Sequence, residues 1–222
     1  MYDERVSRVH RSKESARASY DRMSRWYDWI AGRTEKKYWG LGLQKLGAKA
    51  GERILEIGFG TGDSLVSLAR FVGGTGQVIG IDISENMLTI ARKRLEQADL
   101  SSRVELSQGD GSKLPLVSCL VDAVFMSFTL ELFDTPEIPV VLQECRRVIR
   151  NGGRICVVAL SMEKRSWSVE LYEWFHRNMP EIVDCRPIFV RQSLEKAGFQ
   201  VIDGIVTFMW SLPVEVVLAK RI

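Results

Sequence analysis

The sequence predicts one α/β domain with a seven-stranded, mostly parallel sheet, helices on both faces of that sheet and a C-terminal antiparallel hairpin. Its 222 residues can bury one substantial core but are few for two independent ones. From Arg53 onward, short apolar runs alternate with helical patterns, which is typical of βαβ units and a parallel sheet. Two strand-like runs at the end of the chain predict the hairpin.

The composition is that of an ordinary globular protein, with 45% hydrophobic and 27% charged residues. The net charge of +3 is too small to indicate nucleic-acid binding, and no basic stripe interleaved with aromatic residues is present. The four cysteines are widely spaced without a C-x-x-C pair, so neither a zinc site nor a redox pair is expected. Met1 to Arg17 lack an export signal, and no apolar run reaches about twenty residues, so we expect a soluble, cytoplasmic protein.

Five runs are predicted to form parallel strands, because each is rich in the Val, Ile and Leu of strands buried on both faces. They are residues 53–57, 77–81, 103–107, 121–126 and 154–160. Residues 200–210 and 214–220 are predicted to form the hairpin, joined around Ser211-Leu212-Pro213. The hairpin would complete the sheet with one reversed strand.

Helices are predicted between these strands from apolar residues three or four positions apart. One covers residues 64–71, a second has Ser84 as its N-cap, and a late one covers residues 190–197 and stops at Gly198. Pro136 is expected to open another helix that Asn151-Gly152-Gly153 stops. The inner side of that helix would carry Val140, Val141, Cys145, Val148 and Ile149.

Two aromatic-rich segments flank the predicted sheet. Residues 1–50 are expected to form a helical cover segment, since Trp26, Tyr27 and Trp29 belong to an apolar face at helical spacing. Residues 160–187, which include Trp167 and Trp174, are expected to be an insertion that covers the substrate. The aromatic residues of both segments could equally be core.

The turn after the first strand is rich in glycine and reads Glu56-Ile57-Gly58-Phe59-Gly60-Thr61-Gly62. In open α/β sheets the ligand lies beyond the carboxyl ends of the strands, where glycines permit a tight turn and close backbone approach. The following helix presents free N–H groups there. We therefore favour a ligand site over a turn without a ligand.

The spacing of this loop separates two classes of cofactor. Dinucleotide-binding enzymes use G-x-G-x-x-G here, whereas Asp63 occupies the position of their last glycine. Glu56 would attract a cationic amino acid group and would repel a pyrophosphate. The loop thus favours S-adenosylmethionine over a nicotinamide cofactor.

Acidic residues follow the second and third strands. Asp82 can accept both ribose hydroxyls of an adenosine, and it can also act as a carboxylate at a helix N-terminus. Asp110 can accept from an adenine amino group, with the N–H of Gly111 donating to the ring. An ordinary turn role for Asp110 is the alternative. The fourth strand ends in a segment that contains Ser127 and Glu131 and is expected to face the reacting group.

Five segments together resemble the class I S-adenosylmethionine-dependent methyltransferases: I-L-E-I-G-F-G-T-G, V-I-G-I-D, Q-G-D-G-S-K-L-P-L, V-D-A-V-F-M-S-F and L-Q-E-C-R-R-V-I-R-N-G-G-R. The resemblance spans roughly residues 20–220 and implies a Rossmann-like fold in which residues 51–222 bind S-adenosyl-L-methionine. Within the family, the chain is most similar to the ubiquinone and menaquinone C-methyltransferases and to bacterial phosphatidylethanolamine N-methyltransferases. These share the pattern Y-D-x-x-S-x-x-Y-D seen at residues 20–28.

The resemblance implies which residues bind the cofactor. The glycines would hold its methionine portion, Asp82 its ribose, and Asp110 with Gly111 its adenine. The full implied set is Glu56, Gly58, Phe59, Gly60, Thr61, Gly62, Asp82, Ile83, Met87, Asp110, Gly111 and Ser127, with Tyr20 or Tyr27 near the cofactor. In the quinone enzymes the segment matching residues 127–132 carries a serine, then an arginine and an asparagine. This chain keeps Ser127 but has Glu131 and Leu132, which leaves Glu131 as a candidate base or substrate clamp, or as an exposed loop carboxylate.

Methyl transfer from a sulfonium is an in-line displacement of an already activated group, so alignment in a dry site is the main task and the chemistry requires no metal. An acidic carbon or a protonated amine as acceptor would need a general base, for which Glu131 and Asp110 are the first candidates. We expect a small or lipid-like acceptor, a quinone ring carbon or a phospholipid amine, reached through peripheral membrane contact by an amphipathic cover. The alternatives are a nicotinamide-dependent oxidoreductase and a non-catalytic adenosylmethionine-binding partner protein.

Overall fold

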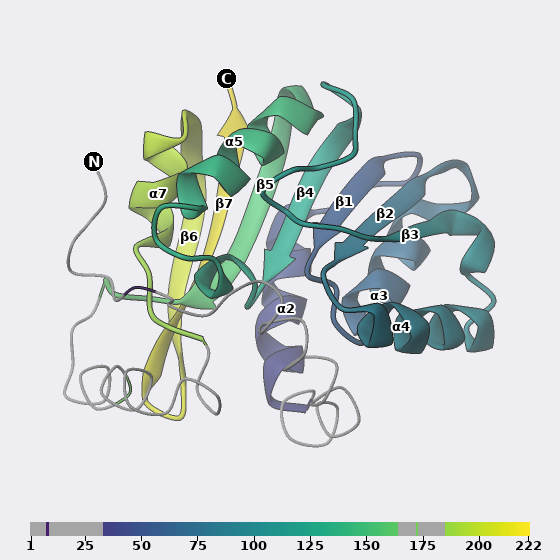
Figure 1. The fold of residues 1–222 in the computed structure, drawn as a ribbon, viewed down its shortest axis with the longest axis horizontal. Helices are drawn as coiled ribbons and strands as arrows, with labels where there is room; N and C mark the ends of the chain where they lie inside the picture. Colours follow the sequence, from purple (N-terminus) through teal and green to yellow (C-terminus); the bar gives the residue numbers. More distant parts are fainter. Residues whose placement is uncertain (1–7, 9–32, 164–171, 173–184) are drawn as a thin grey trace.

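The computed structural model describes residue 8, residues 33–163, residue 172 and residues 185–222. These residues contain a seven-stranded sheet in the order β3-β2-β1-β4-β5-β7-β6 (Figure 1). Strands β1 to β5 are parallel, while β7 is antiparallel to both of its neighbours. The predicted α/β fold with one reversed strand is therefore confirmed. The strands are β1 Arg53–Ile57, β2 Gln77–Asp82, β3 Val104–Gln108, β4 Val121–Ser127, β5 Ile149–Leu160, β6 Phe199–Met209 and β7 Leu212–Arg221.

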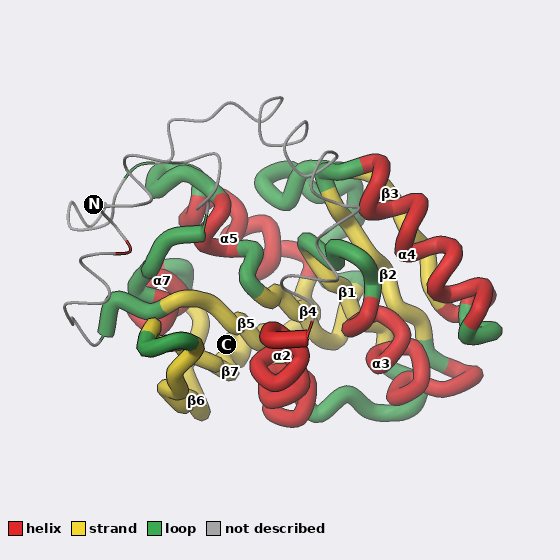
Figure 2. The backbone as a smooth tube through the Cα atoms, turned by 90° about the horizontal axis from the view of Figure 1, so that it is seen from below, coloured by secondary structure: helices red, strands yellow, loops and turns green. Residues whose placement is uncertain are grey.

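Helices cover both faces of the sheet, as Figure 2 shows for α2 and α3 on one side and α5 and α7 on the other. One buried apolar cluster joins α2, α3 and α4 to the sheet, and a second joins α5 and α7 to its opposite face. The central strands β1, β2, β4, β5 and β7 are mostly buried, which explains their Val, Ile and Leu runs, whereas the edge strands β3 and β6 are partly exposed. The helices are α2 Arg33–Leu46, α3 Asp63–Val72, α4 Glu85–Gln97, α5 Ile138–Val148 and α7 Val190–Lys196.

The start of α4 follows the prediction, since the Ser84 hydroxyl accepts the Met87 N–H at 3.2 Å as an N-cap. The start of α5 differs from the prediction that Pro136 opens this helix. This helix begins at Ile138, and Pro139 occupies its first turn, where no backbone donor is needed. Val140 is 49% exposed, so its predicted place on the inner side was wrong.

Strand β5 begins at Ile149 and not at residue 154, so the prediction that Ile149 belongs to a helix was also wrong. Ile149 pairs with Val121, and an irregularity in the register lets the chain pass through the two glycines before regular pairing resumes at Arg154. Gly152 has a φ of 73°, a conformation in which glycine is favoured. The predicted helix stop thus lies within the strand.

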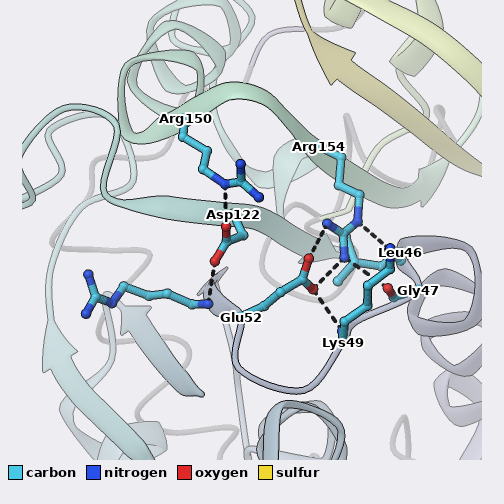
Figure 3. A network of polar contacts seen from close by, with 8 residues as sticks. Leu46, Gly47, Lys49, Glu52, Asp122, Arg150 and Arg154 are labelled. Atoms are coloured by element: carbon cyan, nitrogen blue, oxygen red, sulfur yellow. Dashed lines mark hydrogen bonds and ion pairs between the residues drawn. The ribbon is translucent and has the colours of Figure 1, made fainter. Parts of the chain in front are cut away.

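A polar network holds the amino edge of the sheet together (Figure 3). The Arg154 guanidinium donates to the carbonyls of Leu46 and Gly47 at 2.5 and 3.0 Å, and it pairs with Glu52 at 2.7 Å. Burial would raise the pKa of Glu52, but the hydrogen bonds from Arg154 and from the Lys49 N–H outweigh it and leave this pKa lowered. The network fixes the end of α2 to β1 and β5, away from the edge where the strands end.

The predicted cover segment and insertion fall largely outside the described residues. Of residues 1–50, the described part includes α2, which packs on β4, β5 and β7. Both described ends of the 160–187 segment lie together, because Ser161 and Ile188 form an isolated parallel bridge. Tyr20, Tyr27 and the aromatic residues Trp26, Trp29, Trp167 and Trp174 lie outside the described residues. Among the helices that the structure describes, none is long and apolar enough to cross a membrane.

Candidate active site

A cavity opens at the carboxyl edge of the sheet, where β1 lies between β2 and β4 and the strand order reverses. Ligands of open α/β sheets bind at this position. The loops after β1, β2, β3 and β4 all contribute to its walls, and α2 contributes two residues from its first turns. The lining residues beyond the predicted set include Glu35, Trp39, Asp63, Ser64, Phe128, Thr129, Leu132, Phe133, Asp134 and Glu137.

The glycines of the loop after β1 have different roles. Gly58 and Gly60 line the cavity, both with positive φ. A Cβ on Gly58 would lie 2.4 Å from the side chain of Thr129, whereas a Cβ on Gly60 would meet no atom within 4 Å. The backbone at Gly60 is therefore open to a bound molecule, while Gly58 permits the close approach of β1 and the loop after β4.

Gly62 does not line the cavity, although the prediction placed it against the cofactor. Its N–H donates to the Phe59 carbonyl at 3.0 Å, and its φ is 87° at the N-cap of α3. A Cβ here would lie 2.9 Å from the Cβ of Ala91 on α4. This glycine allows α3 and α4 to pack closely, which the loop spacing alone did not reveal.

Glu56 lies at the base of the cavity and is almost completely buried, with 1% exposure. The Ser64 hydroxyl donates to its Oε1 at 2.5 Å, while its Oε2 has no hydrogen-bond partner in the described structure. Burial, together with the nearby charge of Asp82, raises the pKa of Glu56 to about 8. A buried carboxylate oxygen without a donor is costly, and a ligand cation at this position would satisfy it.

Asp82 ends β2 and holds the glycine loop in place. Its two oxygens accept from the N–H groups of Gly60 and Ser84, each at 2.9 Å. The carboxylate is 7% exposed and lines the cavity beside Ile83 and Met87. It lies just before the start of α4, and its predicted contact with a ribose stays a proposal.

Asp110 and Gly111 line the cavity beyond β3, and their predicted contact with adenine stays a proposal. One oxygen of Asp110 accepts from both the N–H and the hydroxyl of Ser112 at 2.8 Å, which is the turn role considered as its alternative. A Cβ on Gly111 would lie 2.9 Å from Ile57 and 3.0 Å from Phe133. A side chain at this position would overlap Ile57 and Phe133, so the glycine allows these residues to pack closely against the loop.

The loop after β4 forms the opposite wall. Ser127 faces the cavity, and its buried hydroxyl has no hydrogen-bond partner in the described structure. Phe128 has a φ of 50°, a strained backbone conformation for a bulky residue. Its ring packs edge-on against the Tyr38 ring, with the two ring centres 6.2 Å apart. Trp39, Leu132 and Phe133 continue this wall with apolar surface.

Glu131 lies outside the lining of the cavity and is fully buried. Its Oε1 accepts the Leu160 N–H at 3.2 Å, and burial raises its pKa to about 8. The interpretation as an exposed loop carboxylate does not hold, and no part of the carboxyl lies on the cavity wall. The fully buried Arg186, which the sequence did not single out, donates to the Phe133 carbonyl at 2.5 Å and lowers the Glu131 pKa in part.

Every charged residue that lines the described part of the cavity is acidic: Glu35, Glu56, Asp63, Asp82, Asp110, Asp134 and Glu137. Arg94 pairs with Asp63 at 2.8 Å and Arg8 pairs with Asp134 at 2.7 Å, from outside the lining. The sequence predicted that the N-terminal segment could fold over this edge but did not identify Glu35 or Trp39. Both belong to α2, whose boundaries were not predicted from the sequence.

The site has a glycine turn at the switch point, a buried carboxylate beside it with one unpartnered oxygen in the described structure, and acidic side chains after β2 and β3. This arrangement fits a cationic amino acid joined to an adenosine. Fold and site together define a class I S-adenosylmethionine-binding domain.

Comparisons with known proteins extend this assignment. The family described as a methyltransferase domain matches residues 54–153. A demethylmenaquinone methyltransferase of Bacillus velezensis is 30% identical over 181 residues, which cover 81% of this chain and 75% of that protein. One from Oceanobacillus iheyensis is 34% identical over 69% of this chain and 62% of its own length. The Pseudomonas fluorescens ubiquinone/menaquinone biosynthesis C-methyltransferase UbiE is 32% identical over 77% of this chain and 64% of its own length. The chain belongs to the S-adenosylmethionine-dependent methyltransferase family, and its cofactor is S-adenosyl-L-methionine.

The chain spans less than two thirds of the length of the Oceanobacillus iheyensis and Pseudomonas fluorescens relatives. Solved structures agree on the fold. The [4+2]-cyclase SpnF superposes with a TM-score of 0.77 at 18% identity, over 97% of this chain and 98% of its own. A SAM dependent methyltransferase from Aquifex aeolicus superposes with a TM-score of 0.68 at 24% identity, over 91% and 98%.

Proposed function

We propose that this chain transfers a methyl group from S-adenosylmethionine to a quinone-like acceptor with lipid-like, apolar character. The observation that carries the proposal is the apolar wall of Trp39, Leu132 and Phe133, which lines the same cavity as Ser127. The relatives named as quinone methyltransferases support the acceptor class. The wall has the apolar lining that an aromatic ring would contact.

In this proposal the residues at the ends of β1, β2 and β3 hold the cofactor. Glu56 pairs with the cofactor ammonium, the loop around Gly58, Phe59, Gly60 and Thr61 packs on its methionine portion, and Asp82 accepts from its ribose. Ile83, Met87, Asp110 and Gly111 surround the adenine. The bound cofactor supplies an electrophilic methyl group, and the protein aligns the acceptor with it and excludes water.

The loop after β4 orients the acceptor. The Ser127 hydroxyl provides a hydrogen bond to a polar group of the acceptor, and the apolar wall holds its ring. The carboxylates of Glu35 and Glu137 are the lining groups proposed as the general base, because Asp110 is assigned to the adenine. Glu131 acts through its hydrogen bond to Leu160 and keeps this loop on β5, in place of direct contact with the acceptor.

A second candidate acceptor is the amine of a phospholipid. It is favoured by one observation, the exclusively acidic character of the charged residues in the described lining, which stabilises a cationic headgroup. A membrane surface would present either acceptor, so peripheral membrane contact belongs to both versions.

The test uses the purified chain with S-adenosylmethionine and either a demethylated naphthoquinol or phosphatidylethanolamine, each in detergent micelles, with products identified by mass spectrometry. We expect methylated quinol. Phe133→Ala should raise the KM for the acceptor several-fold with little change in cofactor Kd, whereas the exposed Phe71→Ala should change neither. Cofactor binding without methylation of either acceptor would support the non-catalytic partner protein instead. Stabilisation by NAD and not by S-adenosylmethionine would favour the oxidoreductase.

A further inference from the structure

The turn between β6 and β7 lies at the same edge of the sheet as the cavity. Strand β7 is antiparallel to both β5 and β6, so β6 runs in the direction of β4 and β5 and ends at the same edge. Figure 1 shows this hairpin tip at the lower edge of the molecule, below the point where β4 ends. The tip and the cavity therefore lie at the same edge of the sheet, with β5 and β7 between β4 and β6.

The tip presents aromatic side chains to solvent. Phe208 is 52% exposed and Trp210 is 72% exposed. Trp210 and Ser211 make the tight turn with φ values of 48° and 70°, so the large indole occupies a position where asparagine or glycine is the usual choice. Two exposed aromatic side chains at one loop tip indicate a surface that contacts a membrane or a protein partner.

Helix α2 joins this tip to cations and to the cavity. The Tyr38 hydroxyl donates to the Phe208 carbonyl at 2.7 Å. The Lys37 ammonium lies 5.6 Å from the centre of the Tyr38 ring, and Lys36 and Lys37 are both exposed. The next residue, Trp39, lines the cavity. Consecutive residues therefore connect a cationic surface, an aromatic tip and the apolar wall of the site.

We propose that one surface patch of this chain binds an anionic phospholipid bilayer. This patch, called the hairpin patch, consists of Phe208, Trp210, Lys36 and Lys37. Tryptophan and phenylalanine enter the boundary between headgroups and acyl chains, and lysines attract anionic headgroups. The delivery of an apolar acceptor from the bilayer into the cavity rests on the proposed function, whereas the binding itself does not. A second copy of the chain would pair along the open edge of β6, and the lysines of α2 would take no part in that contact.

Flotation with vesicles tests the proposal. Vesicles of phosphatidylcholine mixed with phosphatidylglycerol should carry the wild-type protein upward, and phosphatidylcholine alone should carry less. Phe208→Ser combined with Trp210→Asn should lower the partition about tenfold or more, because each aromatic side chain would lose its burial. Asparagine tolerates the positive φ, so the turn persists. Lys36→Gln with Lys37→Gln should abolish the preference for phosphatidylglycerol.

The matched control is Phe71→Ser. Phe71 is 51% exposed near the end of α3, which lies at the opposite edge of the sheet because the Gly51 N–H donates to the Val72 carbonyl. This variant should float like the wild type. Equal loss in both variants, no flotation of the wild type, or dissociation of a dimer by the double variant would overturn the proposal.

Methylation of a detergent-solubilised acceptor separates the two proposals. If the protein methylates the solubilised acceptor but does not float with vesicles, membrane binding by the hairpin patch is rejected and the proposed function stands. Flotation without methylation would reject the function and leave the docking surface standing.

Discussion

At the scale of single residues, the proposed cofactor site depends on Glu56. Its Oε2 is buried without a partner in the described structure, and its pKa is raised to about 8 by burial first and by Asp82 second. The carboxyl is therefore mostly protonated at pH 7 in the free protein. A cofactor ammonium stabilises the ionised form, so binding must expel the proton.

Cofactor binding should release close to one proton near pH 7. Titration calorimetry in buffers of different ionisation enthalpy measures this release directly. Glu56→Gln should bind the cofactor more weakly and release almost none, while Asp63→Asn, a lining carboxyl already paired with Arg94, should release as much as the wild type. Equal proton release by Glu56→Gln and the wild type would show that the cation does not reach Glu56.

Glu131 makes a different prediction, about stability. Its pKa is raised from 4.5 to about 8 in the folded chain, so the folded protein holds a proton that the unfolded chain has lost between these values. The free energy of unfolding must then fall as pH rises from 4.5 to 8, by at most about 1.4 kcal/mol per pH unit for this group. Glu131→Gln retains an acceptor for the Leu160 N–H and removes this dependence.

The melting temperature of Glu131→Gln relative to the wild type should accordingly increase between pH 6 and pH 8. Differential scanning calorimetry across this range is the measurement. A constant difference would mean that Glu131 is ionised throughout and is paired with Arg186 in the folded protein.

At the scale of elements, the glycine loop separates cofactor contact from helix packing. Gly62→Ala places a Cβ 2.9 Å from Ala91 at a φ of 87°, so we expect it to destabilise the chain by about 1–3 kcal/mol. Gly60→Ala meets open space, so it should cost about 1 kcal/mol for its φ but weaken cofactor binding strongly. Urea unfolding and cofactor titration of both variants are the measurements. A greater loss of stability in Gly60→Ala than in Gly62→Ala would contradict these roles.

The sequence predicted most of the elements, and the errors have physical causes. Periodic apolar runs located every strand and the N-cap of α4, since these depend on local pattern. The start of β5 was missed because pairing of Ile149 with Val121 is a long-range interaction that overrides the glycines as a stop signal. The glycine motif and the strand ends predicted the site at Glu56, Asp82 and Asp110. Trp39 lines the cavity and Arg186 donates to the Phe133 carbonyl through tertiary contacts that no spacing encodes.

At the scale of the whole molecule, the two edges of the sheet have different roles. The amino edge is fixed by Arg154 and Glu52, and the carboxyl edge holds the open, acidic cavity. Arg154→Met should destabilise the chain by about 1–3 kcal/mol, because it leaves the carbonyls of Leu46 and Gly47 without this donor and leaves Glu52 with the Lys49 N–H alone. Arg150→Met, at a more exposed ion pair with Asp122, should cost about 0–1 kcal/mol. Chemical denaturation compares them, and equal losses would contradict the assigned importance of the Arg154 network.

The central claim is methyl transfer to an apolar, quinone-like acceptor, and its most direct test is the fate of a labelled methyl group. The purified chain is incubated with methyl-labelled S-adenosylmethionine and a cell extract, and the labelled product is identified after separation into organic and aqueous phases. The account predicts label on a quinone in the organic phase, with much less in Glu56→Gln. Label confined to a water-soluble product, or no label despite cofactor binding, would contradict it.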